Sequence, residues 1–136
     1  MSQTRRRPIW THVSVLAFYG VLAVVLTWPL VQNLGTHVPG SDTWAYDEYT
    51  FIWNSWWFRY SLFDLGQNPL STTYIFYPVG ISLVLYTYNL FNALISLPLQ
   101  AFLPLPAISN LTFLLSTMLR SYGAFLLVDD LLADEG

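Results

Sequence analysis

A run of uncharged, mostly apolar residues over 13–31 constrains this chain more than any other feature of its sequence. An α-helix rises 1.5 Å per residue, so about 20 such residues cross the ~30 Å hydrocarbon core of a bilayer. Three arginines at positions 5–7 precede the run, and the first acidic residue after it is Asp42. Because basic residues favour the cytoplasmic side, the sequence predicts a cytoplasmic N-terminal segment over 1–12 and a membrane helix over 13–31.

The composition also favours a membrane protein. Of the 136 residues, 54% are hydrophobic and 10% are charged, whereas a soluble domain usually carries about 25% charged residues. The net charge is -3, and no basic cluster exists beyond the first arginines, so nucleic acid is excluded as a partner. The absence of cysteine excludes disulfides, thiolate metal sites and cysteine nucleophiles.

A cleaved signal peptide is the alternative interpretation of this start, because it also begins with basic residues. Its apolar region is about 7–15 residues long and is followed by a cleavage site of small residues. Here the run is longer and ends in Trp28, Pro29 and Leu30. We therefore expect the helix to be retained in the membrane.

Two further apolar segments follow in the second half of the chain. Residues 83–103 are uncharged and include Pro98, which a membrane helix tolerates as a kink when neighbouring groups satisfy the freed carbonyl. Residues 107–128 are apolar apart from Arg120, and residues 129–136 form an acidic tail. We expect both segments to be membrane helices, which makes the protein multi-pass. Since the chain stops soon after a helix, we expect it to be the N-terminal portion of a larger membrane protein.

Arg120 is the exception within the last apolar run. An arginine at mid-membrane costs at least ~2.5 kcal/mol on insertion scales. Its side chain must face a helix bundle, or reach toward the headgroups, or the span must shift. We expect it to be buried against polar groups of neighbouring helices or of the rest of the larger protein.

Residues 32–82 are predicted to form a large outer loop. A polar residue at 41–43 can cap a helix over 43–65, and Gly66 is a typical stop. Polar side chains form one stripe along this helix and aromatic side chains fill most of the rest, which favours a helix that lies in the membrane interface against lipid. The stripe consists of Asp47, Glu48, Asn54, Ser55, Arg59 and Ser61. Residues 71–80 are expected to be extended chain and turn.

The predicted fold is therefore an all-α membrane protein of the cell membrane, with its N-terminus in the cytoplasm. It has three transmembrane helices and one interfacial amphipathic helix in a large first outer loop.

Three carboxylates follow the first predicted membrane helix closely: Asp42, Asp47 and Glu48. Such groups can act as a general base toward an acceptor hydroxyl or amine, or they can hold a divalent cation. Acids in an outer loop are also commonly just solvated, and Asp42 can serve as a helix cap. No Ser-His-Asp set, glycine-rich phosphate loop or metal-ligand cluster is evident.

The order of these features resembles the N-terminal end of the GT-C superfamily, the polytopic glycosyltransferases that use polyprenyl-phosphate-linked sugars. The string Tyr-Asp-Glu-Tyr at 46–49 is similar to the Asp-Glu pair in the first outer loop of protein mannosyltransferases and aminoarabinose transferases. The segments at 53–57, 68–70 and 76–83 are similar to a group of uncharacterised bacterial and archaeal membrane proteins of this type.

The resemblance implies an inverting transfer of a sugar from a polyprenyl-phosphate donor to an acceptor at the outer membrane surface. It places the catalytic carboxylate at Asp47, with Glu48 as its neighbour and Asp42 as its rival. Arg59 is the one basic residue of the outer loop and is expected to meet the donor phosphate. Trp53 and Trp57 can stack on a sugar or anchor the helix in the interface. Because GT-C enzymes have many more spans, we expect this chain alone to be inactive.

A second interpretation is a non-enzymatic polytopic membrane protein, such as a portion of a transporter or an assembly subunit. Transporters tend to place polar groups near the bilayer midplane. Here Arg120 alone fits that pattern, whereas the acids cluster at the predicted outer surface. The sequence therefore favours the transferase.

Overall fold

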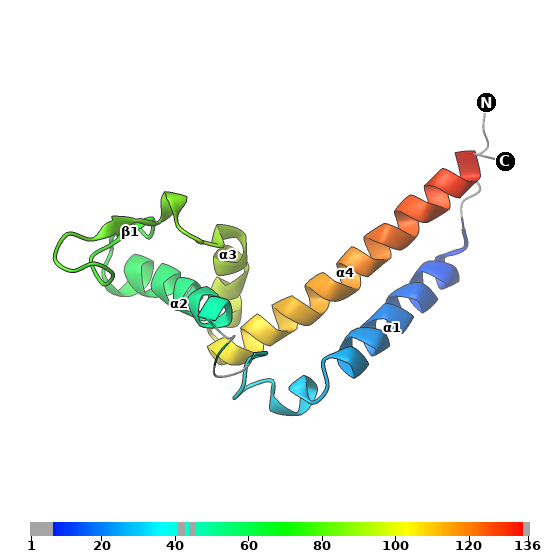
Figure 1. Cartoon of the computed structure of the whole chain (residues 1–136), viewed down its shortest axis with the longest axis horizontal. Helices are drawn as coiled ribbons and strands as arrows, with labels where there is room; N and C mark the ends of the chain where they lie inside the picture. Colours follow the sequence, from blue (N-terminus) through cyan, green and yellow to red (C-terminus); the bar gives the residue numbers. More distant parts are fainter. Residues whose placement is uncertain (1–6, 41–42, 44–45, 135–136) are drawn as a thin grey trace. The chain divides into compact units, whose positions relative to one another are not determined.

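A computed structural model describes residues 7–40, 43 and 46–134 of the chain, and most of these residues are helical (Figure 1). The long elements are α1 (Ile9–Leu26), α2 (Tyr46–Arg59), α3 (Leu90–Leu99) and α4 (Leu105–Asp134). The short elements are η1 (Leu30–Asn33), η2 (Tyr60–Asp64), η3 (Leu83–Leu85) and the strands β1 (Ser71–Thr72) and β2 (Ile81–Ser82). The strands pair antiparallel, with Ser71 opposite Ser82 and Thr72 opposite Ile81.

The chain divides into two compact units. The first comprises Met1–Gln32 and Leu111–Gly136, and we call it the helix-pair unit. The second comprises Asn33–Asn110, and we call it the central unit. α4 begins in the central unit and continues into the helix-pair unit.

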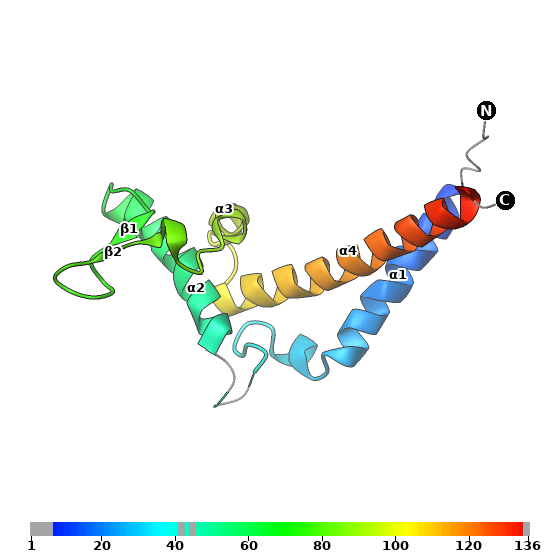
Figure 2. The same cartoon turned by 45° about the horizontal axis from the view of Figure 1, so that its top comes forward.

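In the helix-pair unit, α1 and α4 lie side by side and run in opposite directions (Figures 1 and 2). The Arg7 Nε donates a hydrogen bond of 2.7 Å to the Asp129 carboxylate. Further along, the Tyr122 hydroxyl and the His12 Nδ1 are 2.9 Å apart. These contacts therefore place the start of α1 and the end of α4 at the same end of the pair.

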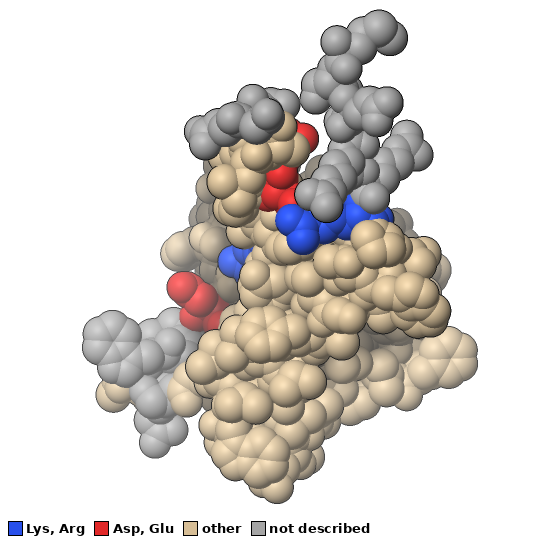
Figure 3. Space-filling model, turned by 90° about the vertical axis from the view of Figure 1, so that its right-hand side faces the viewer, with Lys and Arg blue, Asp and Glu red and all other residues tan. Residues whose placement is uncertain are grey.

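Both helices of this pair are long and apolar enough to cross a membrane. Their mean hydropathies are 2.0 for Ile9–Leu26 and 1.5 for Leu105–Ala133. Only 6% and 0% of these segments are buried within the chain, which is unlike the core helix of a soluble protein. Most of the face in Figure 3 is uncharged, and acidic and basic side chains lie next to each other in its upper part. α1 ends five residues before the predicted end of the first span, in a turn that contains Pro29.

The predicted membrane helix over 83–103 is not present as one helix. The segment starts with η3 and stays extended until Asn89, whose side chain caps α3 by accepting the Asn92 N–H at 3.2 Å. α3 has 10 residues, which is about 15 Å and half of a bilayer core. Leu83 and Ala93 are fully buried. These two side chains belong to the core of the central unit, whereas Leu85, Phe91 and Phe102 of the same segment are exposed. The described residues thus hold two candidate spans instead of three.

The predicted helix of the outer loop is present over most of its length. α2 continues into η2, a π-helical turn that ends at Asp64. Gly66 follows with a φ of +62°, so the predicted stop is confirmed. Of the proposed caps, Ser41 and Asp42 lie outside the described residues.

Part of the polar stripe of α2 faces the interior of the central unit, where α2 packs against α3. Asn54 is 1% exposed, and its side-chain amide donates to the Thr87 carbonyl at 2.8 Å. The Gln100 amide donates to the Ser55 carbonyl at 3.0 Å. Asn54 and Ser61 are buried, whereas Asp47 and Arg59 of the same stripe are exposed, so only part of the stripe can face water. The two buried side chains donate instead to carbonyls of the surrounding chain.

The predicted extended chain and turn over 71–80 is confirmed, since β1 and β2 pair and the chain between them consists mostly of bends and turns. Phe76 has a φ of +58°, and its side chain is 67% exposed. Gly80 has a φ of +73°, and a Cβ at this position would lie 2.6 Å from the Thr72 carbonyl oxygen. Only glycine therefore fits where the hairpin closes.

Replacing Gly80 with alanine is expected to destabilise the hairpin more than the same change at Gly66. Both positions have positive φ, and that conformation costs alanine about 1–2 kcal/mol. A Cβ at Gly66 meets nothing within 4 Å, whereas at Gly80 it meets backbone that cannot rotate away. We expect an additional cost of about 1–3 kcal/mol for Gly80→Ala. Unfolding followed by near-ultraviolet circular dichroism measures it, and equal losses for the two variants would contradict the close approach.

Candidate functional site

The two carboxylates of the predicted catalytic pair lie in the first turn of α2. Asp47 is exposed and Glu48 is half-buried. Successive helical residues point about 100° apart, so the two side chains leave the same end of the helix in different directions. The partial positive charge of a helix N-terminus stabilises both anions. The pair is thus accessible and sits where a helix favours negative charge.

Glu48 holds a proton more strongly than a glutamate in water. Partial burial raises the pKa of Glu48 above its ordinary value of 4.5, and repulsion from the Asp47 carboxylate raises it further. A carboxylic acid with a raised pKa is better suited to exchange protons near neutral pH. Glu48 is therefore a second candidate for proton transfer beside Asp47.

The structure does not bring Arg59, another charged residue proposed for the site, close to this pair. Asp42, the rival base, lies outside the described residues. Arg59 is the last residue of α2 and is exposed. It lies about 18 Å along the helix axis from Asp47, since each residue adds 1.5 Å. One phosphate cannot contact Arg59 while its sugar reacts at Asp47.

The two tryptophans proposed to bind a sugar have different environments. Trp57 has no exposed surface, and its indole N–H donates to the Pro69 carbonyl at 3.0 Å. Trp53 is half-buried and stacks on Trp57, with ring centroids 5.8 Å apart and planes within 3°. Trp57 is therefore a core residue, and only Trp53 offers a ring face to a ligand.

The structure adds an aromatic cluster that the sequence did not predict. Trp56 and Tyr60 stack with ring centroids 4.9 Å apart. Tyr74, which follows β1, lies at 6.3 Å from the Trp56 ring and 6.1 Å from the Tyr60 ring. Tyr74 is 56% exposed. The cluster presents flat apolar surface of the kind that packs on the apolar face of a sugar ring.

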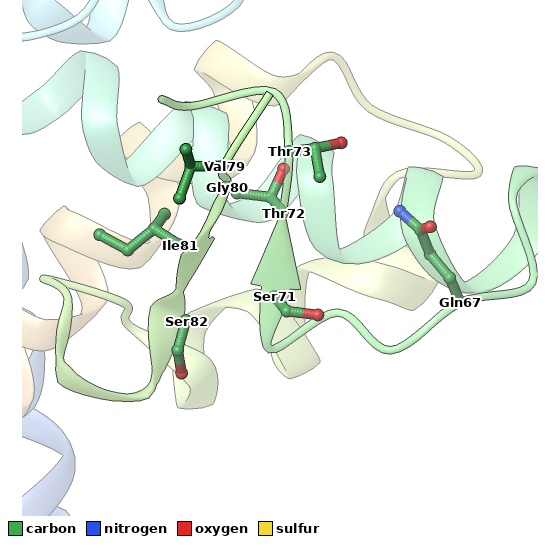
Figure 4. Close-up of a pocket in the computed structure, with 8 residues that line it drawn as sticks. All are labelled: Gln67, Ser71, Thr72, Thr73, Val79, Gly80, Ile81 and Ser82. Atoms are coloured by element: carbon green, nitrogen blue, oxygen red, sulfur yellow. The ribbon is translucent and has the colours of Figure 1, made fainter. Parts of the chain in front are cut away.

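A polar cavity of about 300 Å³ lies along the hairpin (Figure 4). Its lining includes the side chains of Gln67, Ser71, Thr73 and Ser82, and no charged residue. In Figure 4, Gln67 and Ser71 lie on the same side of β1. These groups can donate to and accept from a hydroxylated ligand. Neither residue of the acid pair lines the cavity.

Within the described part of the chain, no three His, Cys, Asp or Glu side chains lie close enough together to hold a metal ion. Comparisons with protein-family models, with curated proteins and with solved structures found no match. The resemblance to GT-C enzymes therefore depends on the residues of the chain alone.

Glu48→Gln is expected to stabilise the chain at neutral pH and to leave it unchanged in acid. Burial and the Asp47 charge raise the pKa of Glu48 in the folded state. The stability that the protonated form provides is fully present below the unfolded pKa and is lost as the pH rises through the folded pKa. Glutamine keeps the neutral form at every pH. Melting temperatures at pH 7 and pH 3.5 test this, with Asp64→Gln as the exposed control. A difference that is larger at pH 3.5 would contradict the raised pKa.

Proposed function

We propose that this chain is the membrane-embedded N-terminal part of a glycosyltransferase. It moves a sugar from a polyprenyl-phosphate donor to an acceptor at the outer membrane surface. The observation that carries the proposal is the accessible Asp47–Glu48 pair on the first turn of α2, in the segment that follows the first apolar helix.

The proposed topology has α1 and α4 crossing the membrane in opposite directions. The arginines at the start of the chain favour a cytoplasmic N-terminus. The ion pair of Arg7 with Asp129 supports a cytoplasmic position for the acidic tail as well. The central unit then lies on the outer side, because both of its ends connect to the outer ends of the two helices. This topology replaces the three-span arrangement expected from the sequence.

The proposed reaction needs one general base. The acceptor oxygen attacks the anomeric carbon, the bond from that carbon to the phosphate oxygen breaks, and polyprenyl phosphate leaves with the bonding electrons. The acceptor proton passes to the Asp47 carboxylate, which is exposed and can approach an acceptor hydroxyl within hydrogen-bonding distance. Attack on the face opposite the phosphate inverts the anomeric configuration. Glu48 holds the proton more readily and can relay it to solvent.

The remaining groups receive roles that fit their positions. Arg59, about 18 Å from Asp47, is proposed to contact the phosphate of a membrane lipid at the other end of α2. Trp53 is proposed to contact the donor, and Trp57 is left with its structural role. The acid pair can alternatively bind a divalent cation that neutralises the donor phosphate. Loss of activity with a chelator, and its return with Mg²⁺ or Mn²⁺, would support that alternative.

The topology is tested by cysteine labelling, because the chain has no cysteine of its own. Gln67→Cys is expected to react with an impermeant maleimide in intact cells. Leu132→Cys, near the end of α4, is expected to react only after permeabilisation. Labelling of both positions in intact cells would support three spans, and labelling of neither would place the central unit in the cytoplasm.

Asp47→Asn keeps the shape of the side chain and removes the base. Turnover is expected to fall by about 10²–10⁴, the contribution of general-base catalysis. Asp42→Asn should cost less, mainly through a weaker helix cap. Asp64→Asn, an exposed acid at the other end of α2, is the matched control and should be fully active. The assay is sugar transfer by membranes that contain the full-length protein.

Other outcomes change the assignment. Full activity of Asp47→Asn together with loss in Asp42→Asn would move the base to Asp42. If both variants stay fully active, the transferase mechanism is wrong, and a non-enzymatic membrane protein becomes the better interpretation.

A further inference from the structure

One face of α4 is occupied by α1 within the helix-pair unit. The α4 residues of this face follow the alternating spacing of four and three that is typical of helices packed nearly parallel or antiparallel. They are Met118 next to Gly20, Tyr122 and Phe125 next to His12, and Asp129 paired with Arg7. We call this row of residues the first seam.

A second row with the same spacing lies on the opposite face of α4. It consists of Phe113, Ser116, Arg120, Gly123 and Leu127, and we call it the second seam. Each helical residue turns the direction by about 100°, so Arg120 points about 200° away from Met118. Ser116 is half-buried and the other four residues are exposed. A Cβ at Gly123 would meet nothing within 4 Å. The second seam therefore has helix-packing spacing and is open.

Arg120 carries a charge in the middle of this seam. Its Nε donates to the Ser116 carbonyl at 3.3 Å, a contact within α4. Among the described residues, the one ion pair is that of Arg7 with Asp129, so Arg120 has no carboxylate partner there. The sequence led us to expect a buried guanidinium, and within the helix pair it is exposed.

Arg120 lies too deep in the proposed span for its guanidinium to reach the lipid headgroups. If Asp129 and Arg7 mark the cytoplasmic edge, Arg120 lies nine residues inside it, about 13 Å along the axis. An arginine side chain is too short to cover that distance. In the apolar core an unpaired guanidinium is unfavourable, and pairing with an anion at the same depth removes most of that penalty.

We propose that the second seam is covered by another transmembrane helix that presents a carboxylate to Arg120. The small side chains of Ser116 and Gly123, one turn to either side of Arg120, let the partner backbone approach closely. The spacing of the seam sets a crossing angle of about 20°. The Arg120 fork can then hold the carboxylate with two parallel hydrogen bonds.

The charge and its depth decide between this partner and two others. A second copy of the chain has the same orientation in the membrane, so a symmetric contact would place Arg120 against Arg120. A lipid phosphate lies in the headgroup region, about 13 Å from the level of Arg120. The proposal rests on the membrane crossing of α4 in the proposed function and is independent of sugar transfer.

The test uses a designed leucine-rich transmembrane peptide with one glutamate at its centre. The chain carries a donor fluorophore on Leu132→Cys, the peptide carries an acceptor, and both are reconstituted in phosphatidylcholine vesicles. We expect energy transfer to indicate at least about tenfold tighter association than for the glutamine version of the peptide, which is the effect of ~1.4 kcal/mol. Arg120→Gln should abolish this preference.

Two matched variants locate the contact. Gly123→Leu fills the second seam and is expected to weaken association with the glutamate peptide. Leu126→Phe adds volume outside the seam and is expected to leave it unchanged. Arg120→Glu should transfer the preference to a peptide with a central lysine, which a merely structural role of Arg120 would not produce.

The results that would contradict the proposal can be told apart from one another. Equal binding of the glutamate and glutamine peptides overturns the proposal. Self-association of the labelled chain that Arg120→Gln removes identifies a second copy and overturns it as well. Association that requires phosphatidylglycerol and ignores the glutamate assigns Arg120 to lipid. Protection of the α4 segment 113–127 from protease shows insertion, so a chain that fails to insert overturns the topology of the proposed function together with the second seam.

Discussion

The antiparallel packing of α1 against α4 is the constraint on which the rest of the structure depends. It returns the chain to the end at which it started, as the contact of Arg7 with Asp129 records. The segment between the helices forms the central unit. It carries no charge between Asp64 and Arg120. Several of its buried polar groups make neutral hydrogen bonds, such as that from Trp57 to the Pro69 carbonyl.

The sequence predicted those features of the fold that depend on local interactions. The apolar run near the start, the helix of the outer loop and its stop at Gly66 follow from composition, periodicity and the conformational freedom of glycine. The length of α3 and the burial of Asn54 could not be predicted from the sequence. A short uncharged segment has the same composition whether it packs inside a protein or lies in lipid, and a polar stripe does not reveal whether carbonyls or water will face it.

In the candidate site, too, some features could be predicted from the sequence and others could not. The neighbouring positions of Asp47 and Glu48, and the distance from Asp47 to Arg59, could be derived from helix geometry alone. The contact of Tyr74 with the Trp56 ring depends on a hairpin that returns toward α2, and no period in the sequence encodes it. The same hairpin creates the polar cavity. The residues that surround a site are set by tertiary structure, even when its reactive groups are visible in the sequence.

Asn110 joins the two ends of the central unit. Its side-chain amide donates to the Leu34 carbonyl at 2.8 Å and to the His37 carbonyl at 2.6 Å, so one side chain joins the entry of the unit to its exit. Asn110 also begins an Asn-Leu-Thr glycosylation motif, but its amide is fully buried and no sugar can be attached there. Chemical ageing of this one amide to aspartate would set a carboxylate against two carbonyl oxygens. The two ends of the central unit would then lose this connection, while the helices themselves stayed intact.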